Sequence, residues 1–164
     1  MSDKVSSAKN FAIEKHGNQL YGDKPYIYHL NMVYEIVLKI NLDEDYQIAA
    51  YLHDCLEDTN TTKKELESKF GKRVSDMVYS VTGEGDSRVE KKNSMLKKLE
   101  KFPEGINLKM ADRLANMLQC KSDGSRKLEM YIKEMPSYMG LFSKGNEELL
   151  IDLISLTKVK KFKP

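Results

Sequence analysis

Along most of the chain, apolar residues recur every three or four positions, the spacing that places them on one face of an α-helix. Alternating apolar and polar positions are scarce, and only four prolines and nine glycines interrupt the pattern. The pattern therefore predicts an all-α helical bundle in a single domain, residues 1–164. The expected helices cover about 6–16, 27–40, 46–56, 63–70, 74–81, 94–102, 105–120, 127–134 and 147–157.

Capping residues and helix breakers set the expected boundaries. Ser6 or Ser7 is expected to cap the first helix, and Thr62 followed by Glu65 predicts a capping box. Proline also restricts the residue before it, which favours a helix end. The expected breaks are a loop at 22–25, a charged loop at 82–93, a connector around Pro136 and Gly140, and a frayed basic tail at 158–164.

Composition excludes several classes of protein. Lys and Arg total 27 against 25 Asp and Glu, a net charge of +2 that is too small for a dedicated nucleic-acid binder. Cys55 and Cys120 lie in separate helical patterns and are expected to be buried free thiols. The start "MSDKVSSAKN" lacks a signal-peptide core, and no segment has the roughly 20 apolar residues of a membrane helix. We expect a cytoplasmic protein with no membrane association, and the sequence does not indicate an oligomeric state.

The stretch "YLHDCLEDTN" concentrates ionisable groups at the end of an apolar helix. It holds His53, Asp54, Glu57 and Asp58, and residues four apart share a face if the helix persists. Crowded carboxylates repel one another and raise each other's pKa unless a cation neutralises them, so the cluster indicates a divalent metal. The alternative is a solvated helix end, because a His-Asp pair alone recurs by chance.

Two further side chains look misplaced for packing alone. His29 in "KPYIYHL" follows a rigid loop, and Asp112 in "LKMADRLANM" is an acid within an apolar helix. Taken singly, His29 could be a core histidine and Asp112 could pair with Arg113 or Lys109. Taken together with the His-Asp pair, these separate explanations become strained, and both residues are candidates for further metal ligands.

The ordered set of these residues resembles the H...HD...D pattern of the HD-domain metal-dependent phosphohydrolases. The segments "KPYIYHLNMV", "AAYLHDCLEDTNTTKKELESKFGKRVSDMVYSVT" and "LKMADRLANM" resemble three successive blocks of the RelA/SpoT-type (p)ppGpp hydrolase domain and of its small single-domain relatives. The blocks fall within a motif core of about 16–135. Their order is far more specific than the His-Asp pair.

This resemblance implies a metal-dependent hydrolase. In the family one divalent cation, usually Mn²⁺, is held by two imidazoles and two carboxylates, which suit a borderline metal. Such a cation lowers the pKa of a water molecule and acts as a Lewis acid on a phosphoryl oxygen. Glu57 and Asp58 match the acidic pair that positions the attacking water and handles protons. The implied metal ligands are His29, His53, Asp54 and Asp112.

The resemblance also implies contacts to a small nucleotide substrate. Asn116 matches a residue placed against the sugar, and Tyr131 matches a tyrosine that contacts the nucleoside. Ammonium and guanidinium groups can bind polyphosphate oxygens, although a solvated face is the alternative for any one of them. The basic candidates are Lys24, Arg88, Lys91, Lys92 and Lys109.

One segment departs from the family pattern. Relatives commonly carry an arginine in a segment like HxGQxR, where it contacts the guanine base. In "HGNQLYGDKPYIYH" this position falls on Tyr21, and the loop to Pro25 is one residue shorter. Tyr21 can stack on a base but cannot supply guanidinium contacts. His16 could help to shape this pocket or could be purely structural.

Three functions remain open on these residues. The first is removal of the 3′-pyrophosphate from ppGpp, pppGpp or an adenine analogue. The second keeps the same centre but acts on another nucleotide, such as a dNTP, a nucleoside monophosphate or a cyclic dinucleotide. The third is a non-catalytic module that binds a nucleotide or a protein and uses the metal structurally.

Overall fold

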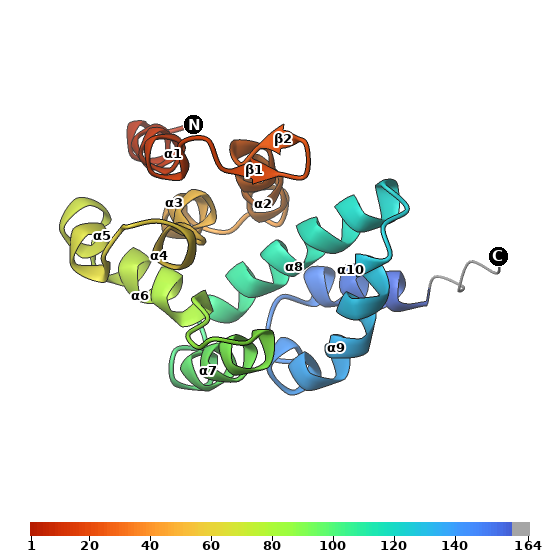
Figure 1. Cartoon of the computed structure of the whole chain (residues 1–164). Coiled ribbons are helices and arrows are strands. Elements are labelled where there is room, and N and C mark those ends of the chain that lie inside the picture. Colours follow the sequence, from red (N-terminus) through yellow and green to blue (C-terminus); the bar gives the residue numbers. More distant parts are fainter. Residues whose placement is uncertain (159–164) are drawn as a thin grey trace.

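The computed structural model describes residues 1–158, and helices dominate it (Figure 1). The two strands within these residues form one short hairpin, so the predicted all-α class is confirmed. In chain order the elements are α1 (Asp3–His16), β1 (Leu20–Tyr21), β2 (Lys24–Pro25), α2 (Ile27–Lys39), α3 (Glu44–Leu52), α4 (Cys55–Asp58), α5 (Lys63–Phe70), α6 (Lys72–Val81), α7 (Arg88–Lys101), α8 (Gly105–Ser122), α9 (Lys127–Phe142) and α10 (Glu147–Thr157).

Helix α8 forms the centre of the bundle. It crosses the middle of the molecule (Figure 1) and packs against α2, α6, α9 and α10. Its side chains are buried around most of its circumference, as expected of a core helix. Two charged residues, Asp112 and Arg113, are buried with them. Buried charges are costly unless they are paired. The burial of these two residues therefore indicates a role beyond packing of the core.

The first helix begins earlier than the sequence indicated. The side chain of Ser2 accepts a hydrogen bond from the backbone N–H of Val5, so Ser2 is the N-cap, and the prediction of Ser6 or Ser7 is wrong. Asp3 then occupies the first turn, where a negative charge interacts favourably with the helix dipole.

The capping box predicted at Thr62 is only half formed. Thr62 accepts from the backbone N–H of Glu65 at 3.1 Å, but the Glu65 carboxylate pairs with Lys15 of α1, at 3.1 Å. A complete capping box lies instead at the start of α7, between Ser87 and Glu90.

The expected loop at 22–25 is part of a tight hairpin. Strands β1 and β2 pair antiparallel, with Tyr21 opposite Lys24, which leaves a two-residue turn. Gly22 begins that turn with a φ of 65°, a conformation that glycine adopts without strain. The hairpin fixes the position of Tyr21 beside α2.

Helix α9 continues through Pro136, so the connector predicted there is wrong. A proline inside a helix loses one backbone hydrogen bond and strains the preceding turn. The residues beyond it, Tyr138, Leu141 and Phe142, are buried against the core. Their burial offsets the local cost, at about 1.5–3 kcal/mol for each large apolar side chain.

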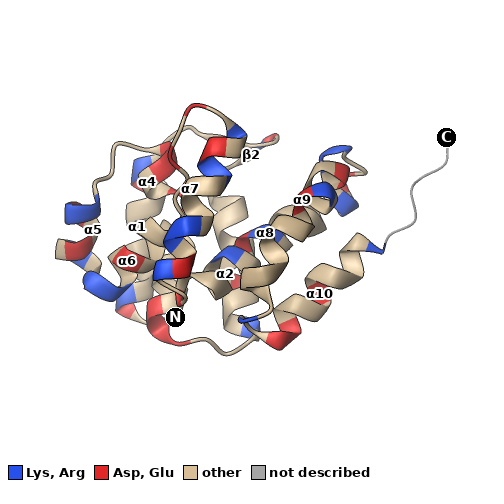
Figure 2. Ribbon diagram, turned by 90° about the horizontal axis from the view of Figure 1, so that it is seen from below, with Lys and Arg blue, Asp and Glu red and all other residues tan. Residues whose placement is uncertain are grey.

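Charged residues of both signs are interspersed on the outer helices (Figure 2).

Both cysteines are free and buried, as predicted. Across residues 1–158, no helix has the length and apolarity needed to cross a membrane. The basic tail lies almost entirely outside the described residues, and the cytoplasmic location stays a prediction.

The start of α8 supplies a test of the packing. A methyl group at Gly105 would overlap Ser80 Oγ and approach Leu99 Cδ2, a fully buried atom, at 2.9 Å. We expect Gly105→Ala to lower the free energy of unfolding by about 1–3 kcal/mol, measured by urea denaturation. The matched control is Gly140→Ala within α9, where a methyl group meets nothing within 4 Å. It should raise stability by about 0.5–1 kcal/mol, and equal losses in both variants would contradict this packing.

Candidate active site

The His-Asp pair lies where one helix ends and another begins. His53 follows the last residue of α3, and Asp54 precedes the first residue of α4. The expected helix end is therefore present, and the condition that the helix persists through the motif is not met. The break lets the two neighbouring side chains turn to the same side, with His53 Nε2 2.9 Å from Asp54 Oδ2.

Side chains from three separate parts of the chain meet at this break. His29 Nε2 lies 3.3 Å from His53 Nε2 and 3.1 Å from Asp112 Oδ1. Asp54 Oδ2 lies 3.7 Å from His29 Nε2, and His53 Nε2 lies 3.5 Å from Asp112 Oδ1. Donors about 2.1 Å from a shared ion lie roughly 3.0–3.4 Å apart, so these spacings are those of one coordination shell. The ligand atoms of His29, His53 and Asp54 all lie within 4.8 Å of one another, so these three residues could hold one metal ion. Asp112 adjoins them through its contacts to the two imidazoles.

Surrounding hydrogen bonds orient three of these four side chains. His53 Nδ1 donates to the carbonyl oxygen of Ala50 at 2.8 Å, which leaves Nε2 with a free lone pair. Tyr26 Oη donates to Asp54 Oδ2 at 2.6 Å, and Asn116 Nδ2 donates to Asp112 Oδ1 at 2.8 Å. Such partners fix the direction of metal-binding groups.

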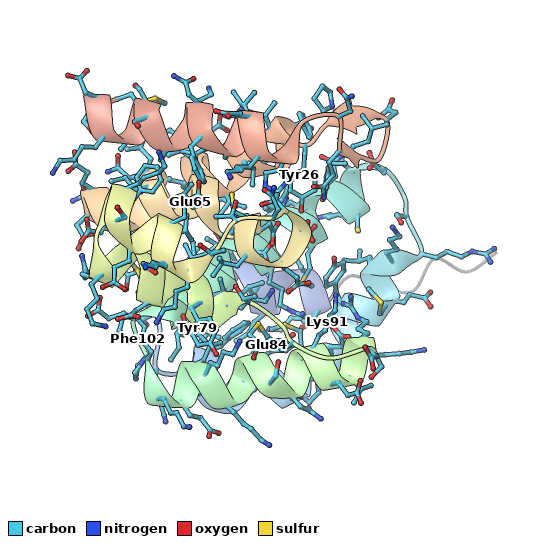
Figure 3. The ribbon with its side chains drawn as sticks, turned by 60° about the vertical axis from the view of Figure 1, so that its left-hand side comes forward. Tyr26, Glu65, Tyr79, Glu84, Lys91 and Phe102 are labelled. Atoms are coloured by element: carbon cyan, nitrogen blue, oxygen red, sulfur yellow. The ribbon has the colours of Figure 1, made fainter. Side chains whose placement is uncertain are left out.

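Sequence reasoning missed Tyr26 as part of the centre. It precedes His29 by three residues at the start of α2, so the two share a helix face. That spacing was the available signal. In Figure 3 the labelled Tyr26 lies above the α4 segment and Lys91 lies below it.

The field inside the cluster favours a positive charge. Burial alone would lower the pKa of His53, but the carboxylates of Asp54 and Asp112 outweigh it and raise that pKa well above the usual value. Burial likewise disfavours the charged carboxylates, yet His53 holds the pKa of Asp54 below its usual range. A divalent cation would satisfy the same carboxylates, so the donor set fits a metal.

Asp112 faces both the cluster and a lysine. Its Oδ1 points to the imidazoles, while Oδ2 accepts from Lys109 Nζ at 2.7 Å. Burial opposes ionisation of Asp112, but Lys109 and the two histidines hold its pKa well below the usual value. The structural ion pair considered as an alternative is therefore present, and it coexists with the cluster.

A cleft of about 380 Å³ opens beside the cluster, and Asp112 forms part of its wall. Several of the residues predicted from the sequence line this cleft. Tyr21, Lys24 and Asp58 are not among its lining residues, and Lys24 Nζ lies over the ring of Tyr28, 4.8 Å from the centroid. The predicted residues that line the cleft are Glu57, Arg88, Lys91, Lys92, Lys109, Asp112, Asn116 and Tyr131.

The two acids of the predicted catalytic pair have different surroundings. Glu57 faces the cleft, where Oε1 accepts from the backbone N–H of Gly83 at 2.7 Å and Oε2 lies 3.6 Å from Lys91 Nζ. Asp58 Oδ2 accepts instead from Gln19 Nε2 at 2.9 Å. Gln19 Oε1 in turn lies 2.7 Å from His16 Nδ1. Two hydrogen bonds through Gln19 therefore connect His16 to Asp58.

The wall formed by α7 and α9 carries an ion-pair network that the sequence did not indicate. Arg88 makes two hydrogen bonds to Glu134, at 2.7 and 3.0 Å, and the buried Arg113 reaches the same carboxylate at 3.3 Å. Both guanidinium groups also lie over the ring of Tyr131, 5.6 and 5.1 Å from its centroid. Arg113 therefore pairs with Glu134 rather than with Asp112.

Comparison with known proteins identifies the class to which this fold and cluster belong. Residues 8–135 match the family described as HD domain. The chain therefore belongs to the HD-domain family, and the resemblance inferred from its motifs is confirmed.

Three relatives of the chain carry the same enzyme name. A guanosine-3′,5′-bis(diphosphate) 3′-pyrophosphohydrolase of Aquifex aeolicus is 37% identical over 123 residues, 71% of this chain but only 18% of that protein. The corresponding enzyme of Danio rerio, named MESH1, is 38% identical over 117 residues, 66% of this chain and 64% of that protein. The MESH1 of Xenopus tropicalis is 36% identical over 124 residues, 71% of this chain and 69% of that protein.

A solved structure supports the fold. It is described as "A metazoan ortholog of SpoT hydrolyzes ppGpp and plays a role in starvation responses". The two folds agree with a TM-score of 0.82 over 95% of this chain and 94% of that one, at 24% identity.

Metal binding at this cluster should be visible as stabilisation. Because a ligand of the folded state stabilises it by mass action, Mn²⁺ at 100 times its dissociation constant should add about 2.7 kcal/mol to the free energy of unfolding. His53→Ala should abolish this increase, measured by urea denaturation with and without Mn²⁺. The control is His16→Ala, a buried histidine outside the cluster, which should keep the increase. An equal increase in His53→Ala would place the ion elsewhere.

Proposed function

We propose that this protein is a metal-dependent pyrophosphohydrolase that releases the 3′-pyrophosphate of ppGpp or pppGpp, or of a related alarmone. The observation that carries the proposal is that the Nε2 atoms of His29 and His53 lie 3.3 Å apart, and that each lies within 2.9–3.7 Å of a carboxylate oxygen of Asp54 and of Asp112, beside a basic cleft. The names of the Aquifex and MESH1 relatives supply the substrate class.

Mn²⁺ is our proposed cofactor. Two imidazoles and two carboxylates form a mixed nitrogen and oxygen donor set that suits a borderline divalent ion. When bound, the ion would supply Lewis-acid stabilisation of a phosphoryl oxygen and a water of lowered pKa. No side chain then has to act as the nucleophile.

Glu57 and Asp58 are proposed to handle the protons of the attacking water. What supports a leading role for Glu57 is its place in the cleft wall, where Gly83 and Lys91 hold its two oxygens. Asp58 is not among the residues that line the cleft, and Gln19 orients its carboxylate. A carboxylate held in one direction can accept a proton without first reorganising.

Basic residues are proposed to bind the polyphosphate. Lys109 supports this by lining the cleft beside the cluster, and Arg88, Lys91 and Lys92 line the wall made by α7. Ammonium and guanidinium groups form charge-assisted hydrogen bonds with phosphate oxygens. Asn116 and Tyr131, also in the lining, are proposed to contact the nucleoside.

The second candidate function is hydrolysis of a different nucleotide by the same centre. The observation that favours it is Tyr21, which stands where relatives commonly have a base-contacting arginine. Its hydroxyl is already bonded to Asn116 at 2.9 Å. Recognition of guanine by this route would therefore differ from that of the relatives.

The substrate assignment is tested by product analysis. Purified protein with Mn²⁺ should release pyrophosphate from ppGpp or pppGpp, while a matched panel of dNTPs, nucleoside monophosphates and cyclic dinucleotides should remain intact. Asp54→Ala should be inactive. Inorganic phosphate from monophosphates would favour the second candidate, and no release from any nucleotide would favour a binding module.

The proton-handling assignment is tested by isosteric variants. Glu57→Gln should reduce kcat by roughly 10²- to 10⁴-fold because general base catalysis contributes that much. Asp58→Asn should cause a smaller loss, since Asp58 does not line the cleft. Circular dichroism and Mn²⁺ content serve as controls and should match the wild type in both variants. Unchanged turnover in Glu57→Gln would remove it from the mechanism.

A further inference from the structure

Two imidazoles form part of the cluster, and they are held in different ways. His53 is fixed by a hydrogen bond from Nδ1 to the carbonyl oxygen of Ala50 at 2.8 Å. The Nδ1 of His29 is buried and has no hydrogen-bond partner among residues 1–158. Metal-binding histidines usually donate this second N–H to a partner that sets the ring orientation. Something else must therefore orient the ring of His29.

Tyr21 packs directly on that ring. The two rings are stacked, with their centroids 4.8 Å apart and an interplanar angle of 16°. Aromatic pairs in such arrangements contribute about 0.5–1.5 kcal/mol beyond the burial of their area. The stack therefore limits rotation of the His29 ring, which no hydrogen bond of Nδ1 restrains.

The hydroxyl group of the same tyrosine reaches a second member of the cluster. Tyr21 Oη donates to Asn116 Oδ1 at 2.9 Å, and Asn116 Nδ2 donates to Asp112 Oδ1 at 2.8 Å. This hydrogen bond fixes which way the Asn116 amide faces, because its oxygen must point to Tyr21 and its nitrogen to Asp112. Tyr21 thus acts on His29 through its ring and on Asp112 through its hydroxyl.

The backbone explains why Tyr21 can hold both residues at once. It is the last residue of β1, opposite Lys24 across the tight turn that begins at Gly22. The hairpin restricts the position of this backbone. The Tyr21 side chain can therefore contact His29 of α2 and Asn116 of α8 at the same time without any rearrangement of the loop.

We propose that Tyr21 is a positioning residue for the metal centre, which orients His29 by stacking and Asp112 through Asn116. This inference rests on the proposed metal centre but not on the identity of the nucleotide. It gives Tyr21 a role different from the base contact expected at its position.

Calorimetric titration of the metal-free protein with Mn²⁺ tests the proposal without any nucleotide. Tyr21→Phe keeps the ring and removes the hydroxyl, and it should weaken Mn²⁺ binding roughly tenfold, while Tyr21→Leu, which also removes the stack, should weaken it closer to 100-fold. The matched control is Tyr28→Phe. Tyr28 Oη donates to Gln119 Oε1 at 3.0 Å, a similar bond to the same helix, but Gln119 bonds Asp123 and not the cluster. Its Mn²⁺ affinity should equal that of the wild type.

A double-mutant cycle tests the route through Asn116. If the hydroxyl acts by orienting this amide, Tyr21→Phe should cause no further loss of Mn²⁺ affinity in an Asn116→Ala background. Full additivity of the two losses would overturn the route. Mn²⁺ affinity in Tyr21→Phe equal to that of the wild type would overturn the proposal, and a raised KM for nucleotide at unchanged Mn²⁺ affinity would assign Tyr21 to the substrate instead.

The same titration separates this proposal from the proposed function. Wild-type protein that binds Mn²⁺ but hydrolyses no alarmone would reject the substrate class and leave the role of Tyr21 standing. Wild-type protein that takes up no Mn²⁺ would reject the metal centre and the role of Tyr21 together.

Discussion

The structure depends on holding two carboxylates and two imidazoles at one point within a helical core. Desolvation makes such a cluster unfavourable for each charged group taken alone. Mutual attraction reverses this penalty, because the carboxylates raise the pKa of His53 while the histidines and Lys109 lower the pKa of Asp112. Each group is therefore stabilised in its charged form by the others, and the two carboxylates favour a cation at the centre of the cluster.

The helical architecture meets this requirement. His29 comes from α2, the His-Asp pair from the junction of α3 and α4, and Asp112 from α8. Helix α2 packs against both α3 and α8, so the three contributions meet where those helices touch. The cleft then opens on the side of α8 that faces α7 and α9, where basic side chains can neutralise a polyphosphate.

Much of this arrangement could be predicted from the sequence, because helical periodicity and the ordered motifs do not depend on distant contacts. The helix break at His53 could not, since it is set by the packing around the junction rather than by a proline or glycine. The continuation of α9 through Pro136 had the same origin, because burial beyond the proline overrode a local preference. Tertiary packing decided both.

The supporting residues were harder to find than the ligands. Tyr26 and Glu134 contact charged groups that are distant in sequence, at residues 54, 88 and 113. The only local signal is the three-residue spacing between Tyr26 and His29, and the local pattern around Glu134 gives none. The only signal at Tyr21 in the sequence is that it replaces the arginine of a family motif. Its contacts to His29 and Asn116 depend on a hairpin that two-residue strands scarcely encode. Ligand types are thus visible in sequence, whereas the groups that orient them emerge from the fold.

The most direct measurement of the central claim is a crystal structure of the Mn²⁺-loaded protein with anomalous scattering recorded at the manganese edge. If the four side chains bind one ion, there should be one strong anomalous peak within bonding distance of His29 Nε2, His53 Nε2, Asp54 and Asp112. A peak bound by other residues, or no peak between these four side chains at saturating Mn²⁺, would contradict this claim.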